Sequence, residues 1–243
     1  MIGKVSRVAV LFVCAAFTSC GGGGGGGGDQ GTTPAPAPAP TPAPTPPPPP
    51  PPPPPPAPPP PAAMIPPRAQ PPIDISGVTS TVGVDHWGNN SAVNGGQGET
   101  IDGIPCRTMD QTYHIHTHLS IAVNDQLLSV PEFLGMVPAT STFGGCFYQI
   151  HTHDKSGRLH IESPVPVDYV LGSFFKIWGQ PLTTTNVGGI TGMPIVFYIT
   201  DEDGVTTVYD GDPTAIELKP HREITIQIGT PISAIPNFTW TPN

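Results

Sequence analysis

The clearest pattern of apolar and polar positions lies between residues 112 and 123, and it predicts a β-strand. Ile115 and Leu119 alternate with polar side chains, and successive side chains of a strand point to opposite faces. One face of this strand can therefore enter a core while the other carries polar groups. A tight hairpin turn is predicted at Asn124-Asp125, a dipeptide that tolerates positive φ, and it leads into the next strand.

A second hairpin is predicted to join residues 146–153 with residues 158–163. With a four-residue loop, His151 lies opposite His160 and the apolar positions of the two strands face one another. With a three-residue loop that contains a glycine bulge, His160 pairs with Thr152 instead and turns away from the other histidines. Turn chemistry permits both registers, but joint burial of the apolar side chains favours the first.

One helix is predicted after Asp168, whose side chain is suited to cap it, and before Gly179, which is suited to end it. Its apolar side chains recur at helical spacing and are expected in the core: Leu171, Phe174, Phe175 and Trp178. Further strands are predicted at residues 194–200, 205–209 and 223–228. These elements together predict an α+β domain of mostly antiparallel β structure, with a single main helix packed on the sheet.

The N-terminal segment, residues 1–19, is typical of a lipoprotein-type signal peptide. Lys4 and Arg7 precede a short apolar stretch, which ends with Phe-Thr-Ser before Cys20. This ending resembles a bacterial lipobox, in which the cysteine becomes the lipidated N-terminus, although leucine is more usual where this chain has phenylalanine. The apolar stretch is shorter than the roughly 20 residues that a transmembrane helix requires. We therefore expect a lipid on Cys20 that attaches the protein to a membrane.

Residues 20–73 are expected to form a lipid anchor and a disordered linker, because eight consecutive glycines and a long proline tract follow Cys20. In enteric-type lipoproteins, an aspartate directly after the lipidated cysteine resembles an inner-membrane retention signal. This chain has Gly21 at that position. We therefore expect a cell-envelope protein at the outer membrane, facing the periplasm or the cell surface. The remaining residues, 74–243, are numerous enough for one globular domain with its own core.

The formal net charge of −9 argues against nucleic acid as a partner, because the sequence has no basic patch to neutralise phosphates. The same acidity favours metal cations weakly, through its electrostatic field. No sequence feature identifies a protein partner.

Two cysteines, Cys106 and Cys146, remain once the signal peptide and the lipidated Cys20 are set aside. An even pair in an oxidising compartment predicts a disulfide. The alternative is that both thiols are metal ligands, which an oxidising compartment disfavours.

Six of the eight histidines lie between residues 114 and 160 and are the main candidates for function. They are His114, His116, His118, His151, His153 and His160. Strand alternation places the first three on one face, and the four-residue hairpin loop would bring the last three together. Neutral imidazole is a common ligand of zinc and copper. We therefore expect a copper or zinc site on adjacent strands, in which His116, His118, His151 and His153 act as a unit.

The chain resembles an uncharacterised group of secreted bacterial proteins with paired His-x-His motifs. The resemblance rests on four segments: YHIHTHL from Tyr113, CFYQIHTHD from Cys146, HIESP from His160 and LGSFFKIWG from Leu171. It covers roughly residues 106–229 and implies one exported domain. It implies no activity, so the function has to be argued from the residues themselves.

Three functions are compatible with these features. The histidines can hold a transition metal for storage, delivery or sensing. They can instead be solvated or hydrogen-bonded to one another in a structural or interaction module of the envelope that binds no metal. A metal-dependent hydrolase is the third, with Glu162 or Asp154 as general base. Neither carboxylate lies in a recognised catalytic motif, so a binding protein is favoured over an enzyme.

Overall fold

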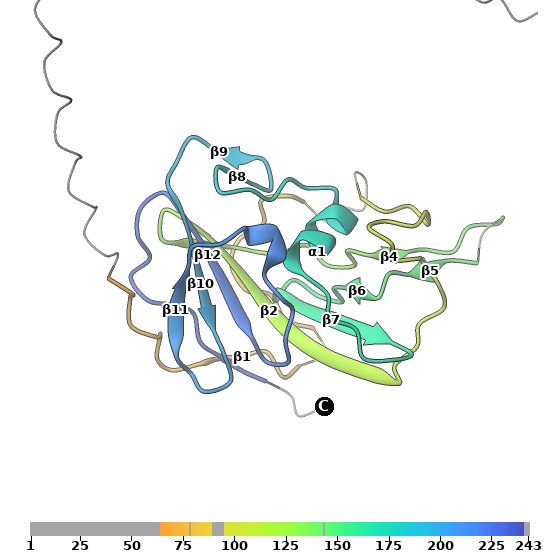
Figure 1. Cartoon of the computed structure of the whole chain (residues 1–243), viewed down its shortest axis with the longest axis horizontal. Helices are drawn as coiled ribbons and strands as arrows, with labels where there is room; N and C mark the ends of the chain where they lie inside the picture. The colour runs from red at the N-terminus through yellow and green to blue at the C-terminus, as the bar shows by residue number, and fades with distance from the viewer. Residues whose placement is uncertain (1–63, 78, 89–94, 143, 241–243) are drawn as a thin grey trace, which may run out of the picture. The chain divides into compact units, whose positions relative to one another are not determined.

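The computed structural model of the chain describes residues 64–77, 79–88, 95–142 and 144–240 (Figure 1). The predicted signal peptide, Cys20 and most of the predicted linker lie outside these residues. The described part is rich in β structure and contains one α-helix, which confirms the predicted α+β class. None of the helices described is both long enough and apolar enough to cross a membrane.

A seven-stranded sheet forms the centre of the domain. Its strands are β2 (Tyr113–Val123), β3 (Gln126–Leu128), β6 (Ile150–His151), β7 (Arg158–Ser163), β10 (Ile195–Thr200), β11 (Thr206–Tyr209) and β12 (Glu223–Ile228). The strand order is β11-β10-β12-β2-β7-β6, and β3 pairs with the end of β2. Neighbouring strands of this sheet are antiparallel, except that β12 and β2 are parallel.

Six shorter strands pair outside the main sheet. They are β1 (Ile73–Asp74) with β13 (Phe238–Thr239), β4 (Met136–Val137) with β5 (Cys146–Phe147), and β8 (Asn186–Val187) with β9 (Ile190–Thr191). A 3-10 helix, η2 (Pro213–Ala215), precedes β12. The β1 and β13 pair joins the two ends of the described domain, because it brings the first strand against the last.

The first predicted hairpin is confirmed. Asn124 and Asp125 have φ angles of 49° and 68°, and Val123 pairs with Gln126 directly across the turn. Positive φ at both central residues is the geometry of a type I′ turn, which matches the twist of the flanking strands. The turn therefore fixes the end of β2.

The second hairpin adopts the register expected from a four-residue loop. His151 pairs with His160, and Ile150 pairs with Ile161. His160 also lies opposite His116 on β2. Three neighbouring strands, β2, β7 and β6, thus carry a row of histidines across one face of the sheet.

Gly157 allows the loop of this hairpin to lie against β2. Its φ is +91°, and a Cβ atom at this position would lie 2.2 Å from the backbone oxygen of Leu119. The amide of Leu119 also donates to the oxygen of Gly157, at 2.8 Å. Only glycine fits this close approach without strain.

The predicted strand over residues 146–153 is interrupted in the structure. β5 ends at Phe147, and β6 contains only Ile150 and His151. Between them, the amide of Tyr148 bonds to the oxygen of Gly135 at 2.8 Å. This contact lies where the chain passes from the β4–β5 pair to the main sheet, a change of partner that alternation alone does not predict.

The helix α1 (Leu171–Trp178) covers one face of the sheet and is almost entirely buried (Figure 1). Phe174, Phe175 and Trp178 pack in one hydrophobic cluster with apolar residues of β2, β7 and β12, as the sequence predicts. The predicted cap is wrong: the N-cap is Val170, which makes no side-chain cap hydrogen bond, and not Asp168. The helix ends at Gly179 in the left-handed conformation, as expected.

The opposite face of β2 has two kinds of cover. Towards the end of the strand, Ala122 packs with Ile232 and Ile235 of the C-terminal segment. Next to this cluster, Phe238 stacks on the ring of His118, with centroids 3.6 Å apart. The first half of the strand, which carries His114 and His116, instead faces side chains of β7 and β6.

Candidate metal centre

The structure brings five of the six predicted histidines together with one glutamate. Two groups have donor atoms within 4.8 Å of one another: His151, His153, His160 and Glu162, and His114, His116 and His160. His160 belongs to both groups. His116, His151, His160 and Glu162 are buried, and His114 and His153 are partly exposed. The six side chains come from β2, β6, β7 and the loop after β6.

The first group, His151, His153, His160 and Glu162, is held by the hairpin between β6 and β7. The Nε2 atoms of His151 and His153 are 3.1 Å apart. Glu162 places Oε1 3.9 Å from His151 Nε2 and 3.5 Å from His160 Nδ1. The rings of His153 and His160 meet edge to face, with centroids 4.3 Å apart. Pairing of His151 with His160 and alternation along β7 are therefore what gather these side chains.

The second group, His114, His116 and His160, is formed where β2 pairs with β7. His160 Nδ1 lies 3.3 Å from His114 Nε2 and 3.1 Å from His116 Nε2. Glu162 Oε1 lies 3.3 Å from His114 Nε2, so the carboxylate also borders this group. The two groups are thus adjacent and share the same strand, β7.

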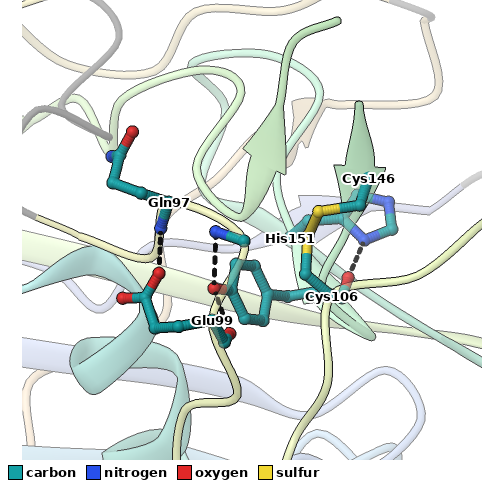
Figure 2. Close-up of a disulfide and its surroundings, with 7 residues drawn as sticks. Gln97, Glu99, Cys106, Cys146 and His151 are labelled. Carbon is teal, nitrogen blue, oxygen red and sulfur yellow. Dashed lines mark hydrogen bonds between the residues drawn. A yellow bond between two sulfur atoms is a disulfide. The ribbon is translucent and has the colours of Figure 1, made fainter. Parts of the chain in front are cut away.

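His151 is oriented by the backbone. Its Nδ1 atom lies 2.9 Å from the carbonyl oxygen of Tyr148, and Figure 2 draws this bond in the surroundings of the disulfide. A carbonyl only accepts, so Nδ1 of the neutral ring carries the proton and Nε2 keeps its lone pair. That lone pair faces His153. Hydrogen bonds of this kind fix the tautomer of histidines that bind metals.

Glu162 is a buried carboxylate with incomplete hydrogen bonding. Oε1 accepts from Gln111 Nε2 at 3.2 Å and lies near three of the histidines. Oε2 is buried and has no hydrogen-bond partner among the described residues, and the same is true of His160 Nε2. Buried polar atoms without partners are uncommon, so each of these atoms calls for an explanation.

The buried imidazoles of the centre, His116, His151 and His160, are neutral at pH 7. Burial lowers the pKa of His116 and of His151 to about 3. Burial, and to a smaller extent the proximity of His153 and the positive charge of Arg158, lowers the pKa of His160 to about 2. The pKa of His153 is also lowered, mainly by burial. Neutral imidazole is the form that binds a metal ion, so no proton has to leave before binding.

His118 lies apart from both groups, although the sequence predicts it as a ligand. Its Nε2 atom donates to the carbonyl of Ser156 at 2.8 Å, and Ser120 Oγ lies 3.4 Å from its Nδ1. Its ring stacks on Phe238 and is completely buried. Both nitrogens are therefore engaged by the protein. Alternation places His118 on the correct face, but its neighbours give it a packing role.

The two remaining cysteines, Cys106 and Cys146, are joined by a disulfide (Figure 2). It ties the segment before β2 to β5, which leads into β6. Because both sulfurs are bonded to each other, neither is a thiolate ligand. These two cysteines therefore offer a metal no thiolate donor at this centre.

Asp154, the other carboxylate considered as a general base, has a structural role. It accepts from the amide and hydroxyl of Ser156 at 2.9 and 2.6 Å and from the amide of Ser80 at 3.1 Å. It also pairs with Arg158 at 3.3 Å. These bonds hold the hairpin loop in place, which leaves Glu162 as the carboxylate of the centre.

A cavity of about 130 Å³ borders the centre and is lined in part by His151 and Glu162. Arg107, Asp110 and Gln149 provide further polar groups on its wall. The cavity is large enough for a few water molecules or a small ligand. Donor atoms of the centre can therefore be reached from one side.

Glu162 is the residue that the predicted ligand set omits. It follows His160 by two positions on the same strand, so strand alternation places both side chains on one face. The signal was thus present in the sequence as His160-x-Glu162. His221, by contrast, lies in a different cavity and pairs with Glu202 at 2.9 Å.

Comparison with known proteins gives no match: no protein-family model, no curated protein and no solved structure is significantly similar to this chain. The argument for function therefore rests on the geometry described above.

Proposed function

We propose that this protein is a cell-envelope lipoprotein whose domain binds copper or zinc for storage, delivery or sensing. His151, His153, His160 and Glu162 would hold the ion. One observation carries the proposal: these four side chains, three of them buried, converge with donor atoms within 4.8 Å of one another.

The distances between the nitrogens support this function. A tetrahedral ion with bonds of about 2.0–2.1 Å to nitrogen keeps its ligand atoms about 3.3 Å apart. The separation of His151 Nε2 from His153 Nε2, 3.1 Å, is close to that value. Small rotations of the side chains would bring His160 and Glu162 to the same distance.

The unsatisfied atoms favour a metal over a purely structural network of histidines. A buried polar atom without a partner costs about 1–3 kcal/mol. Within the part of the chain that the structure describes, Oε2 of Glu162 and Nε2 of His160 both lack hydrogen-bond partners. A network built for stability alone would be expected to satisfy them, whereas a cation in the first group would bind them directly.

The donor set indicates the class of metal. Imidazole nitrogen suits zinc, copper, iron and nickel, and soft thiolate ligands are excluded because Cys106 and Cys146 form a disulfide. The disulfide also fits an oxidising compartment, which supports the envelope location expected from the signal peptide and Cys20. Among ions of this class, zinc takes histidine nitrogens in tetrahedral sites, and copper also accepts imidazole.

Metal analysis of the mature exported protein tests the proposal. The protein would be purified without a tag or chelator, and its zinc and copper content measured by mass spectrometry. We expect at least one ion per chain, and a large loss of affinity in His153→Ala. The matched control is His221→Ala, which removes a histidine outside the centre. A folded wild-type protein that binds neither metal in titration would exclude the proposal.

A metal-dependent hydrolase is the second candidate, favoured by the cavity beside His151 and Glu162. In that case Glu162 would act on a metal-bound water, which requires a position on the ion left open by the protein. Hydrolytic turnover that is lost on chelation and restored by zinc would assign this activity. Tight binding without turnover on ester, amide and phosphate substrates would leave storage, delivery or sensing.

A further inference from the structure

We infer that the domain holds a second metal ion, bound by His114, His116 and His160, and that His160 and Glu162 bridge it to the first. This inference rests on the proposed function, since it assumes an ion at His151 and His153. It makes the centre dinuclear rather than mononuclear. The ligands that belong to the second ion alone, His114 and His116, come from β2, a strand that contributes no ligand to the first ion.

The three nitrogens of the second group are already spaced like ligands of one ion. His160 Nδ1 is 3.3 Å from His114 Nε2 and 3.1 Å from His116 Nε2. Both values are close to the edge of about 3.3 Å expected for tetrahedral coordination by nitrogen. In the absence of a metal, the single Nδ1 atom of His160 can take part in only one ordinary hydrogen bond, yet two imidazole nitrogens lie against it.

His160 has a nitrogen for each ion. Its Nδ1 atom faces His114 and His116, whereas its Nε2 atom is buried and without a hydrogen-bond partner among the described residues. An imidazole that binds through Nδ1 and Nε2 loses its one N–H proton to solvent and bridges two ions as an imidazolate. Bridging would thus use the nitrogen that the protein leaves unsatisfied.

Glu162 also has two oxygens to share. Oε1 lies 3.3 Å from His114 Nε2 and 3.9 Å from His151 Nε2, so it borders both groups, and Oε2 is buried without a hydrogen-bond partner among the described residues. A carboxylate can give one oxygen to each of two ions, as in other two-metal sites. Each ion would then have two histidines of its own, a nitrogen of His160 and an oxygen of Glu162. A single ion could not use all of these donors at a coordination number of four.

The number of ions per chain tests the inference without any substitution. Zinc would be titrated into the metal-free, disulfide-bonded mature protein, and the bound ions counted by native mass spectrometry. Two ions are expected at saturation. Saturation at one ion would overturn this inference and leave the proposed function intact, whereas binding of no ion would remove both.

Paired variants locate the second ion. His114→Ala combined with His116→Ala should bind one zinc, and His153→Ala should also bind one, because each change removes ligands of a different ion. His221→Ala, which removes a histidine in another cavity, should still bind two and so excludes adventitious surface binding there. Two ions bound by the folded His114→Ala/His116→Ala protein would overturn the inference.

Copper(II) provides a readout that does not depend on counting. Two bridged copper(II) ions couple magnetically, so the integrated electron paramagnetic resonance signal should fall well below that of two isolated ions. The His114→Ala/His116→Ala protein should give the full signal of one ion. An uncoupled two-ion signal in the wild type would contradict the proposed bridge.

Discussion

The two halves of β2 carry histidines on the same face and use them in different ways. In the first half, His116 lies against His160 and belongs to a group of donor atoms. Two residues further on, His118 stacks on Phe238 and bonds to the backbone of Ser156. Both rings are buried, and burial lowers the pKa of each to about 3. What differs is the cover: histidines of β6 and β7 in one case, an aromatic ring in the other.

The comparison shows what strand alternation determines and what it leaves open. It decides which face a side chain occupies, because successive residues point to opposite sides. It does not decide what lies above that face. The second half of β2 is covered by residues near the C-terminus, whereas the histidines of the first half lie beside those of the β6–β7 hairpin in the same sheet. The contacts of the first half are the more local in sequence.

Acidification of the metal-free protein should have the largest effect and should involve both halves. The pKa of His118 is about 3 in the folded state, compared with about 6.5 in an unfolded chain. The unfolded state therefore binds more protons between these pH values, so stability is complete above about pH 6.5 and declines as the pH falls towards 3. We expect the free energy of unfolding, from urea titrations with a chelator, to fall between about pH 7.5 and pH 5 by about 2 kcal/mol for each histidine whose pKa is lowered to this extent. These histidines are His116, His118, His151 and His160.

Added zinc should distinguish the contributions of the two halves of β2 to this pH dependence. An ion bound to the clustered histidines opposes their protonation, so their contribution to the decline should move to lower pH. His118, which is not a ligand in the proposed centre, should keep its own contribution. A free energy of unfolding that does not change over this pH range in the metal-free protein would contradict the prediction.

Substitution of His118 and of His116, one at a time, should separate the effect on stability from the effect on metal binding. His118→Ala leaves the carbonyl of Ser156 without its donor and a cavity against Phe238, so we expect a loss of about 3 kcal/mol in stability. The zinc affinity of the folded protein should stay close to that of the wild type. Urea unfolding and isothermal titration with zinc measure the two quantities.

His116→Ala is the matched variant, since it removes the same ring two positions away. It should reduce the magnitude of the free energy of zinc binding at the second group by more than it lowers the free energy of unfolding. The distinction between the halves would be untenable if folded His118→Ala lost zinc binding as severely as His116→Ala.

Gln111→Ala should give the smallest effect. Its amide donates to Glu162 Oε1 at 3.2 Å, and partners of this kind orient metal ligands without touching the ion. We expect the zinc affinity to fall by about tenfold, with little change in stability. Titration of Gln126→Ala, which changes an exposed glutamine on β3 across the turn from the end of β2, provides the control. Equal affinities for the two variants would show that Gln111 does not support the centre.

Much of the fold follows from local patterns in the sequence. Positive φ at Asn124 and Asp125 and the apolar stripe of α1 are properties of short segments, and both are confirmed. The pairing of His151 with His160 also follows, because it is the register that buries the apolar side chains of both strands on one face. The row of histidines on β2, β6 and β7 could therefore be predicted.

The rest depends on contacts between distant parts of the chain. The role of His118 is set by Phe238, and the break between β5 and β6 is set by Gly135. The start of α1 at Val170 has no side-chain cap; instead, the amide of Leu171 bonds to Ile216 at 2.8 Å. None of these contacts leaves a periodic signal in the sequence around the residue that it affects.

The parallel pairing of β12 with β2 has a consequence for the order of folding. His118 lies opposite Glu223, about a hundred residues later in the chain, whereas every proposed ligand lies on β2 or on the hairpin that follows it. Closing so long a loop is entropically slow, so contacts within the shorter antiparallel segment should form earlier. Until β12 arrives, β2 has one edge without a neighbour, and an unpaired edge invites association with other chains. Early capture of an ion by His114, His116 and His160, the proposed second group, would hold β2 against the hairpin during this interval and shorten the time in which it can aggregate.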